Sequence, residues 1–504
     1  MKQFLIALLI GAASAFAFAP TGLWPLMSLA IAGLCELVWR SRSLKHTLAL
    51  GWGFGLGQFV IGLNWIATAF TFQAAMPAWF GWIAVILLSL YLAVYPAMAA
   101  GLAWRFKGKT PLALALVLAG AWPLTEWLRG TMFTGFPWNP LGVTLADTPL
   151  LSISTIVGTY GLTLIAVLGG GSLWLLLKKQ WRAPLAAAIL LVIASLATMP
   201  FAVTAPNAGR KYVRVVQPNI GQEDKWQQGF DDEAARRLAA LSIRPGGSRP
   251  RLTFWPEAAV TEPLQDQRTD EHQVFAQFER TRAAALVGPG EYLLTGGLAV
   301  FSRDGRWIDG ATNSVFVLGT GGQVVGRYDK AHLVPYGEYL PMRPLLSSIG
   351  LSRLAPGDID FASGPGPRTV ILPGWGKVGF QLCYEIVFSG EVVDRRNRPD
   401  VIFNPSNDAW FGRWGPPQHL AQARLRAAEE GIPIIRSTPT GISAVIDAHG
   451  HVVASLPWRT AGAIDAVFPT AAPTTLFGRF GNVIPLLLGA FLLIGGIAVS
   501  RTRR

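Results

Sequence analysis

Eight apolar stretches are each long enough, allowing for tilt, to cross a hydrocarbon core of about 30 Å. They cover residues 4–20, 22–39, 47–70, 79–104, 111–127, 150–177, 183–201 and 482–500. The pattern predicts a membrane domain of seven transmembrane helices over 1–205, an eighth helix over 482–500 and a basic cytoplasmic tail over 501–504.

The first apolar stretch has a second interpretation. Lys2, a short apolar run and the sequence Ala17-Phe18-Ala19 are also typical of a cleavable signal peptide. Pro20 would follow the most obvious cleavage site, which favours a retained helix. Both interpretations leave the topology of the later stretches unchanged.

Residues 212–468 follow another pattern, in which short β-branched runs alternate with polar amphipathic ones, as in a layered α/β domain. The predicted strands are 212–220, 251–259, 292–301, 313–319, 369–374, 377–385, 400–406, 434–439 and 443–448, and the predicted helices are 230–242, 269–288 and 418–431. Because no helix follows the glycine-rich segment 319–322, this segment predicts a hairpin turn and not a dinucleotide loop.

Composition supports a membrane protein. Charged residues make up 14% of the chain, against about 25% in soluble domains. The chain holds 19 Trp and 55 Gly, two residue types that are enriched in or beside membrane helices. These values exclude a wholly soluble or disordered chain.

The net charge of +13 raises the question of a nucleic-acid partner. Basic residues in short patches beside the apolar stretches equal this excess in number: Lys2, Arg40, Arg42, Lys45, Arg105, Lys107, Lys109, Lys178, Lys179, Arg182, Arg501, Arg503 and Arg504. The remaining basic residues balance the 30 acidic ones. The charge is therefore that of membrane-flanking loops, and we expect no nucleic-acid partner.

The same patches predict the orientation. Every second connection between stretches carries one, whereas the alternate connections 19–21 and 71–78 carry no Lys or Arg. By the positive-inside rule both termini are then cytoplasmic, and residues 212–468 lie on the opposite side, which is the periplasm in a bacterium.

Two segments of the membrane domain have a pattern of their own. Residues 51–57 place glycines four residues apart in two rows, which predicts close helix packing. Residues 121–141 place Glu126 and Arg129 beside Trp122, Trp127 and Trp138. This second segment is interpreted either as an aromatic belt at the outer interface or as a re-entrant contact with a lipid substrate.

Candidate chemistry begins with a cysteine. The chain has only Cys35 and Cys383, which excludes a disulfide framework. Cys383 ends the apolar strand K-V-G-F-Q-L-C and precedes Tyr384 and Glu385. A cysteine in an apolar strand is usually an inert core residue, so its reactivity depends on a base or a cation nearby.

Two other strand ends offer such groups. Glu257 follows T-F-W-P, where burial against Trp255 would raise the pKa of a carboxylate towards that of a general base. Lys330 ends G-R-Y-D-K and could stabilise both a thiolate and a developing oxyanion. A glutamate or a lysine considered alone is more often a solvated surface residue than a catalytic one.

Histidine is the competing partner for a cysteine. The chain has six, His46, His272, His332, His419, His449 and His451, and none has a supporting motif. Because H-x-x-x-H and C-x-x-C spacings are absent from the sequence, we expect no metal site. We also expect no cofactor.

The segments W-P-E, Y-D-K-A-H-L-V-P-Y-G-E-Y and L-C-Y-E resemble the three catalytic segments of the carbon–nitrogen hydrolase (nitrilase) superfamily, in the order Glu, Lys, Cys. The resemblance covers about 212–468 and implies an α-β-β-α sandwich outside the cytoplasm. The chain places seven spans before this domain and one after it. This arrangement resembles that of the apolipoprotein N-acyltransferase family of bacterial inner membranes. Q-P-N-I-G-Q-E-D-K-W, P-S-N-D-A-W-F-G and T-G-F-P-W-N-P-L-G also resemble segments of that family.

The resemblance implies a catalytic triad of Cys383 as nucleophile, Glu257 as general base and Lys330 as oxyanion stabiliser. It implies supporting or substrate-binding roles for Glu338, Tyr384, Glu385, Asn407, Trp226 and Trp410, with Glu338 orienting the other charges. The implied reaction is the final step of lipoprotein maturation, in which a Cys383 thioester carries an acyl chain from phosphatidylethanolamine to the N-terminal S-diacylglyceryl cysteine of an apolipoprotein. The implied setting is the bilayer of the inner membrane, where we expect a monomer.

Two other functions compete. A membrane-tethered amidohydrolase would use the same triad with water as the acceptor, although a simple tether needs only one span. A transporter or scaffold with an inactive outer domain would not need the intact Glu, Lys and Cys set.

Overall fold

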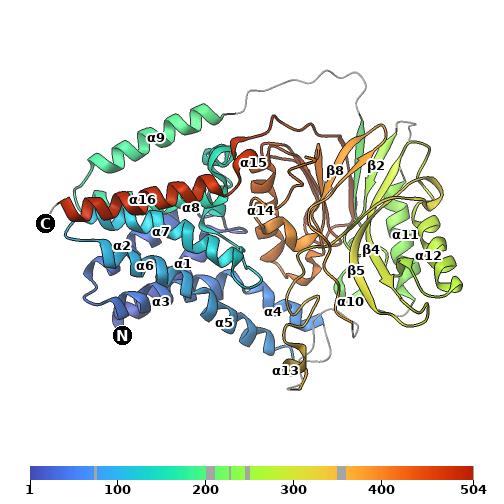
Figure 1. Ribbon diagram of the computed structural model, residues 1–504, viewed down its shortest axis with the longest axis horizontal. Helices are drawn as coiled ribbons and strands as arrows, with labels where there is room; N and C mark the ends of the chain where they lie inside the picture. Colours follow the sequence, from blue (N-terminus) through green and yellow to red (C-terminus); the bar gives the residue numbers. More distant parts are fainter. Residues whose placement is uncertain are drawn as a thin grey trace.

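The computed structural model describes residues 1–72, 77–199, 211–225, 227, 229–243, 250–348 and 359–502. They form a helical domain, built from the helices before residue 200 and the last helix, beside a sandwich domain that holds the strands (Figure 1). Trp226, the predicted domain end at 205 and the basic residues Arg503 and Arg504 lie outside the described residues.

Helices cover every apolar stretch. They are α1 (Lys2–Ser14), α2 (Pro25–Arg40), α3 (Leu44–Gly62), α4 (Trp65–Ala69), α5 (Phe80–Leu92), α6 (Val94–Phe106), α7 (Pro111–Thr131), α8 (Ser154–Leu177), α9 (Arg182–Thr198) and α16 (Val483–Thr502). Within the described residues, four segments are long and apolar enough to span a membrane: Phe80–Phe106, Pro111–Thr131, Pro149–Leu177 and Val483–Thr502. The bent pair of α3 and α4 makes a fifth, whereas α1 and α9 are shorter, so the total of eight spans stays a prediction.

Glycines let α3 approach two neighbours closely. A Cβ atom at Gly51 would lie 2.8 Å from the Cα of Ala97 in α6. One at Gly57 would lie 2.1 Å from the carbonyl oxygen of Leu8 in α1. Only glycine fits at contacts this short, which confirms the close helix packing predicted for residues 51–57.

Two sheets form the sandwich domain. The first has the order β13-β1-β2-β4-β5-β6, with β3 beside β4, and the second has the order β12-β11-β10-β9-β8-β7. The first contains β1 (Tyr212–Gln217), β2 (Arg251–Phe254), β3 (Pro263–Asp266), β4 (Tyr292–Phe301), β5 (Gly310–Leu318), β6 (Val324–Asp329) and β13 (Gly462–Val467). The second contains β7 (Thr369–Leu372), β8 (Gly376–Phe380), β9 (Val401–Pro405), β10 (Ile434–Ser437), β11 (Ala444–Ile446) and β12 (Val452–Ser455).

Central strands such as β5 and β9 are buried on both faces, because both faces of the sheets are covered there. In β5, Val315 and Val317 belong to the core between the sheets, whereas Phe316 belongs to the core under the outer helices. Phe254 and Phe403 join the sheets, with ring centroids 4.9 Å apart. Helices α11 (Phe230–Ser242) and α12 (Asp270–Ala283) cover the first sheet and α14 (Gly415–Glu430) covers the second (Figure 1). The predicted α-β-β-α sandwich is confirmed.

The segment 377–385 differs from its prediction as a strand. Strand β8 ends at Phe380, and Cys383 begins the 3-10 turn η6 (Cys383–Val387). Cys383 has a φ of 52°, a left-handed value that turns the chain out of the sheet.

The predicted hairpin at 319–322 is confirmed, since β5 and β6 pair antiparallel. Strands β3, β6, β12 and β13 were not among the predicted strands; β6 follows the predicted hairpin, and β3 has the sequence P-L-Q-D, which contains no β-branched residue.

Helix α14 also joins the two domains, since it packs on α8 as well as on the second sheet (Figure 1). Helix α8 is broken at Gly158, which has a φ of 62°. The freed backbone N–H of Thr159 donates to the carboxylate of Glu429 on α14. Arg426 pairs with the same carboxylate at 2.8 Å. A buried ion pair therefore caps the broken helix and fixes the position of α14.

The contacts of α3 predict opposite results for two matched substitutions. Gly57→Ala should lower the thermal unfolding temperature of the detergent-solubilised protein, because overpacking costs about 1–3 kcal/mol. Gly62→Ala, in the same helix, places its methyl group 3.8 Å from the nearest side chain and should leave the temperature unchanged or raise it. Equal effects of the two substitutions would contradict the packing described here.

Candidate active site

Three segments that leave the sheets bring Glu257, Lys330 and Cys383 together. Glu257 lies three residues beyond β2, Lys330 directly follows β6, and Cys383 lies three residues beyond β8. All three are buried, and the ammonium group of Lys330 lies 3.7 Å from Oε1 of Glu257. The charges predicted from separate motifs are therefore neighbours.

Glu338 is the closer partner of the lysine. Its Oε2 lies 2.8 Å from the Lys330 Nζ and also accepts the backbone N–H of Val334 at 2.9 Å. The side chain of Asn313 in β5 donates to both carboxylates, at 2.7 Å to Glu257 and 2.9 Å to Glu338. Asn313 was not predicted as a site residue, and its position at the start of an apolar strand gave no signal.

The electrostatics of the site keep the thiol protonated at rest. Burial raises the pKa of Cys383 well above its usual range, and the negative Glu257 raises it further. Lys330 and the backbone N–H of Asn407 act in the opposite direction. Burial alone would lower the pKa of Lys330, but Glu338 and Glu257 outweigh it, so this pKa is raised and the lysine stays charged.

Glu385 connects the segment after Lys330 to the cysteine turn. Its Oε1 accepts the Tyr328 hydroxyl at 2.8 Å and the backbone N–H groups of Ala331 and His332 at 2.8 and 3.0 Å. Its Oε2 accepts the backbone N–H of Leu382 at 2.7 Å. One buried carboxylate therefore fixes the segment after Lys330 relative to the turn that begins at Cys383.

Tyr384 faces the helical domain. Its hydroxyl donates to the carbonyl oxygen of Gly135 at 3.3 Å, and its ring stacks on Trp138 at a centroid distance of 6.4 Å. His332 bonds the carbonyl oxygen of Thr134 at 2.8 Å. The loop after α7 is thus in direct contact with the segments that hold Lys330 and Cys383.

Charged groups of the helical domain hold this loop. Arg129 donates to the carbonyl oxygens of Phe136 and Trp138, both at 2.8 Å. Glu126 accepts the backbone N–H of Leu141 at 2.9 Å. The aromatic-belt interpretation is wrong for Trp138 and Trp122, because their side chains are 0% and 1% exposed.

The three remaining predicted site residues are Asn407, Trp410 and Trp226, of which the structure describes the first two. Asn407 is buried beside Cys383, and its side chain donates to Gln222 at 3.2 Å. Trp410 is half-buried and packs edge-on against Phe72 of the helical domain at 5.9 Å. Trp226 lies outside the described residues, so its predicted role is not tested.

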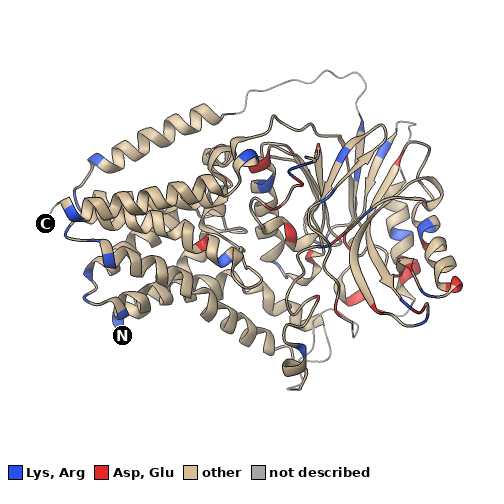
Figure 2. Ribbon diagram, viewed as in Figure 1, with Lys and Arg blue, Asp and Glu red and all other residues tan. Residues whose placement is uncertain are grey.

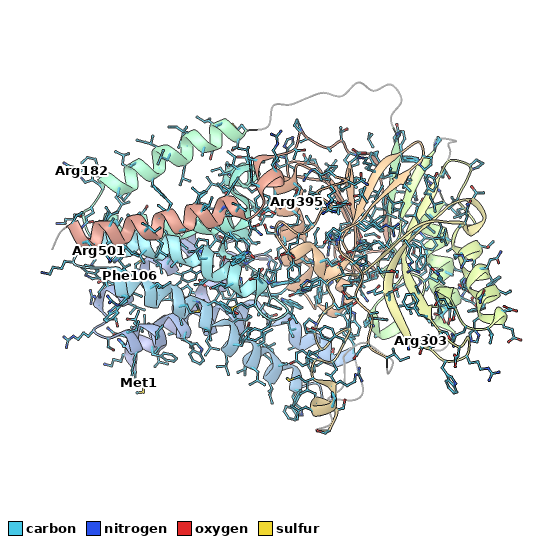
Figure 3. All side chains as sticks on the ribbon, viewed as in Figure 1. Met1, Phe106, Arg182, Arg303, Arg395 and Arg501 are labelled. Atoms are coloured by element: carbon cyan, nitrogen blue, oxygen red, sulfur yellow. The ribbon has the colours of Figure 1, made fainter. Side chains whose placement is uncertain are left out.

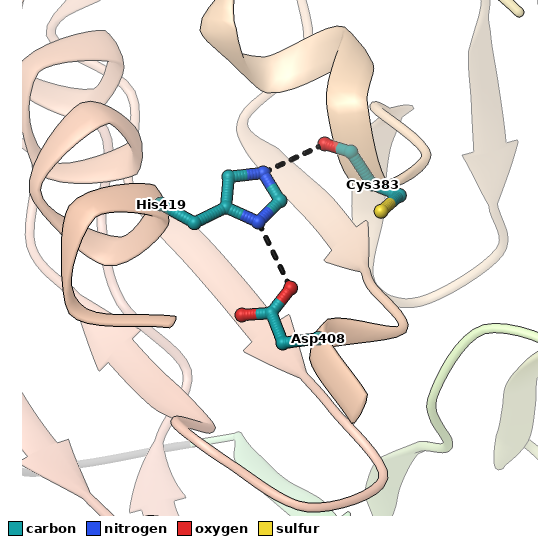
Figure 4. Close-up of side chains that lie close together, drawn as sticks. All are labelled: Cys383, Asp408 and His419. Atoms are coloured by element: carbon teal, nitrogen blue, oxygen red, sulfur yellow. Dashed lines mark hydrogen bonds and ion pairs between the residues drawn. The ribbon is translucent and has the colours of Figure 1, made fainter. Parts of the chain in front are cut away.

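His419, which has no supporting motif in the sequence, also lies at the cysteine. Cys383, Asp408 and His419 are buried, and one ligand-type atom of each lies within 4.8 Å of the others (Figure 4). Nε2 of His419 lies 3.0 Å from the backbone oxygen of Cys383, and Nδ1 lies 2.9 Å from Asp408. Asp408 also pairs with Arg436.

This group does not suit a metal ion. A carbonyl oxygen only accepts, so His419 Nε2 carries a hydrogen and offers no lone pair. The Asp408 carboxylate is already neutralised by Arg436. The other imidazole nitrogen, Nδ1, lies 3.0 Å from the Arg436 guanidinium, and this buried positive charge opposes a second cation at the same place.

Comparison with known proteins identifies the family. The model of the apolipoprotein N-acyltransferase N-terminal domain matches residues 10–172, and that of carbon-nitrogen hydrolases matches residues 212–471. The chain is 36% identical to apolipoprotein N-acyltransferase of Bradyrhizobium diazoefficiens, over 99% of this chain and 95% of that protein. It is 35% identical to apolipoprotein N-acyltransferase of Caulobacter vibrioides, over 99% and 94% of the two chains.

Among solved structures, Nit3 of Saccharomyces cerevisiae, a member of the nitrilase superfamily, aligns with a TM-score of 0.37 and 18% identity. The alignment covers 54% of this chain and 94% of that one. The family models and the relatives decide the assignment, because together they extend over both domains. The chain is a membrane protein that belongs to the apolipoprotein N-acyltransferase family.

Proposed function

We propose that the protein transfers a fatty acyl group from phosphatidylethanolamine to the α-amino group of the S-diacylglyceryl cysteine at the N-terminus of an apolipoprotein. The observation that carries the proposal is the buried thiol of Cys383 beside a carboxylate and an ammonium group. The relatives, which are named apolipoprotein N-acyltransferases, support the choice of acceptor.

In the first step, Glu257 takes the proton of the Cys383 thiol while the sulfur attacks the ester carbonyl carbon of the phospholipid. The carbon–sulfur bond forms and the ester carbon–oxygen bond breaks. The glycerol oxygen takes the proton from Glu257 and leaves as a lysophospholipid, while Lys330 stabilises the oxyanion. A positioned base is required because burial keeps the resting thiol protonated.

In the second step, the amino group of the acceptor attacks the thioester. Glu257 takes a proton from the amine and returns it to the departing sulfur, so the amide forms and Cys383 is restored. Glu338 and Asn313 act as positioning residues in both steps, because they hold Lys330 and Glu257 at fixed distances.

The supporting residues hold the segments around the triad in place or lie near the substrate entrance. Glu385 holds the lysine and cysteine segments together, and Tyr384 holds them against the helical domain. Asn407 directs a backbone N–H at the sulfur. Trp410, and Trp226 by its motif, would contact the lipid chains near the substrate entrance.

We further propose that the helical domain crosses the inner membrane with both termini in the cytoplasm and the sandwich domain in the periplasm. Lys and Arg gather at the end of the helical domain that is remote from the sandwich domain (Figure 2). Met1, Phe106, Arg182 and Arg501 all lie at that end (Figure 3). This distribution supports the orientation because positive charge accumulates on the cytoplasmic side.

The thioester gives the first test. Wild-type protein incubated with phosphatidylethanolamine should gain the mass of a fatty acyl group, measured by intact-protein mass spectrometry. Neutral hydroxylamine should remove the added mass, and Cys383→Ala and Cys383→Ser should never gain it. An acyl increment that persists in Cys383→Ala would rule out this nucleophile, and no increment on folded wild-type protein would favour the amidohydrolase or scaffold functions.

Glu257→Gln should change two properties of the site in opposite directions. Loss of the base should slow thioester formation by about 10²–10⁴-fold. Loss of the negative charge should lower the pKa of the Cys383 thiol, so that half-maximal alkylation by iodoacetamide moves to a lower pH.

The matched control is Glu271→Gln, at an exposed position on α12, which should change neither property. Lys330→Ala should move the alkylation midpoint to a higher pH and slow thioester formation by about 10²–10³-fold. If alkylation of the Glu257→Gln protein needed a higher pH than that of wild type, Glu257 would not raise the pKa of the thiol.

A further inference from the structure

The backbone of Cys383 adopts a conformation that it does not favour. Its φ of 52° is left-handed, although the residue is not glycine. Such a residue persists only when its surroundings fix it, and fixed strain of this kind is common at active sites. The question is therefore which contacts hold the main chain of the nucleophile.

His419 makes the contact that meets this need. Its Nε2–H donates to the backbone oxygen of Cys383 at 3.0 Å, from a fully buried position on α14. In Figure 4 the dashed line from the imidazole ends at that oxygen and not at the sulfur. Helix α14 is itself fixed between α8 and the second sheet, so the donor comes from a rigid element.

The imidazole is itself fixed by charged groups. Its Nδ1 lies 2.9 Å from Oδ1 of Asp408 and 3.0 Å from Nη2 of Arg436. Arg436, on β10, also pairs with Asp408 and donates to Ser406 at 2.9 Å. The ring of Trp138, from the helical domain, packs on the imidazole with centroids 5.2 Å apart. Three elements and both domains therefore determine one ring orientation.

The same carboxylate controls a second group at the sulfur. Asp408 directly follows Asn407, whose backbone N–H favours the thiolate of Cys383. Asp408 is fully buried and begins the 3-10 turn η7 (Asp408–Trp410). A shift of Asp408 would thus move both the imidazole and this backbone donor.

We infer that His419, oriented by Asp408 and Arg436, is a positioning residue that holds the main chain of Cys383 so that its sulfur faces Glu257 and Lys330. The imidazole does not take the proton of the thiol, because its Nε2 already carries a hydrogen and the lone pair of its Nδ1 accepts from the Arg436 guanidinium. This inference rests on the proposed function, since its effect is on the formation of the thioester.

Two substitutions of His419 separate positioning from base catalysis. His419→Gln keeps a side-chain N–H that can reach the Cys383 carbonyl oxygen, but it removes every possible base. We expect it to form the thioester within about threefold of the wild-type rate, because the hydrogen bond to the main chain is retained. His419→Ala removes the donor and should slow thioester formation by about 100-fold, the effect of displacing a reacting group by about 1 Å.

The rates are measured by mass spectrometry with phosphatidylethanolamine on the monodisperse fraction from size-exclusion chromatography, so that they refer to folded protein. The pH of half-maximal iodoacetamide alkylation is measured on the same samples. It should rise in His419→Ala, because the sulfur loses its alignment with Lys330 and the Asn407 N–H, and it should stay unchanged in His419→Gln. His451→Ala, on an exposed hairpin of the same domain, is the matched control and should match wild type in both measurements.

Each alternative has its own result. Equal losses of rate in His419→Gln and His419→Ala would show that the imidazole itself is needed, which would overturn the inference in favour of a Cys–His base. A wild-type rate in folded His419→Ala would overturn it in favour of a purely structural role. If His419→Ala does not fold, an unchanged rate in folded Asp408→Asn would also overturn it. Failure of the wild-type protein to form a thioester would instead count against the proposed function.

Discussion

A buried ammonium group is the constraint on which the active site depends. The side chain of Lys330 is 1% exposed, and removing such a charge from water costs several kcal/mol. Two carboxylates offset this cost, and Asn313 holds both of them at hydrogen-bonding distance. Their negative charge has a second effect, since Glu257 raises the pKa of the nearby thiol. The charge balance that keeps the lysine buried thus also keeps the Cys383 thiol protonated at rest.

The active site lies where the two domains meet, and each contributes to its geometry. The loop after α7 contacts Tyr384 and His332, while Trp138 donates to Gln418 on α14 at 2.8 Å. Buried Glu126 and Arg129 hold that loop, so polar groups that are expensive within a helical membrane domain have a structural purpose here. The proposed substrates are both lipids, and this arrangement places the thiol beside the helical domain, which is the domain proposed to lie in the bilayer.

Much of this architecture could be predicted from the sequence, because its signals are periodic or local. Apolar stretches located the helices, β-branched runs located most strands, and three short motifs located Glu257, Lys330 and Cys383. The left-handed turn at Cys383 could not be predicted, since the apolar run continues through Leu382 and hides the end of β8.

Asn313 and His419 could not be found either, because their partners lie far away in sequence. Asn313 is 56 residues from Glu257, and His419 is 36 residues from Cys383. Trp138 shows a related effect, since a tryptophan near a predicted interface can face lipid or protein, and only the packing of Tyr384 and His419 against it decides between them. Polar contacts between residues that are distant in the sequence are thus the part of the site that sequence patterns do not predict.

The most direct test of the central claim follows the acyl group after it leaves the enzyme. Acyl-enzyme prepared from phosphatidylethanolamine and freed of excess lipid would be mixed with a short peptide whose N-terminal cysteine carries an S-diacylglyceryl group, and both species would be followed by mass spectrometry. The account predicts that the peptide gains on its α-amino group the acyl mass that Cys383 loses. Release of the same chain as free fatty acid, with the peptide unchanged, would contradict it and identify a hydrolase.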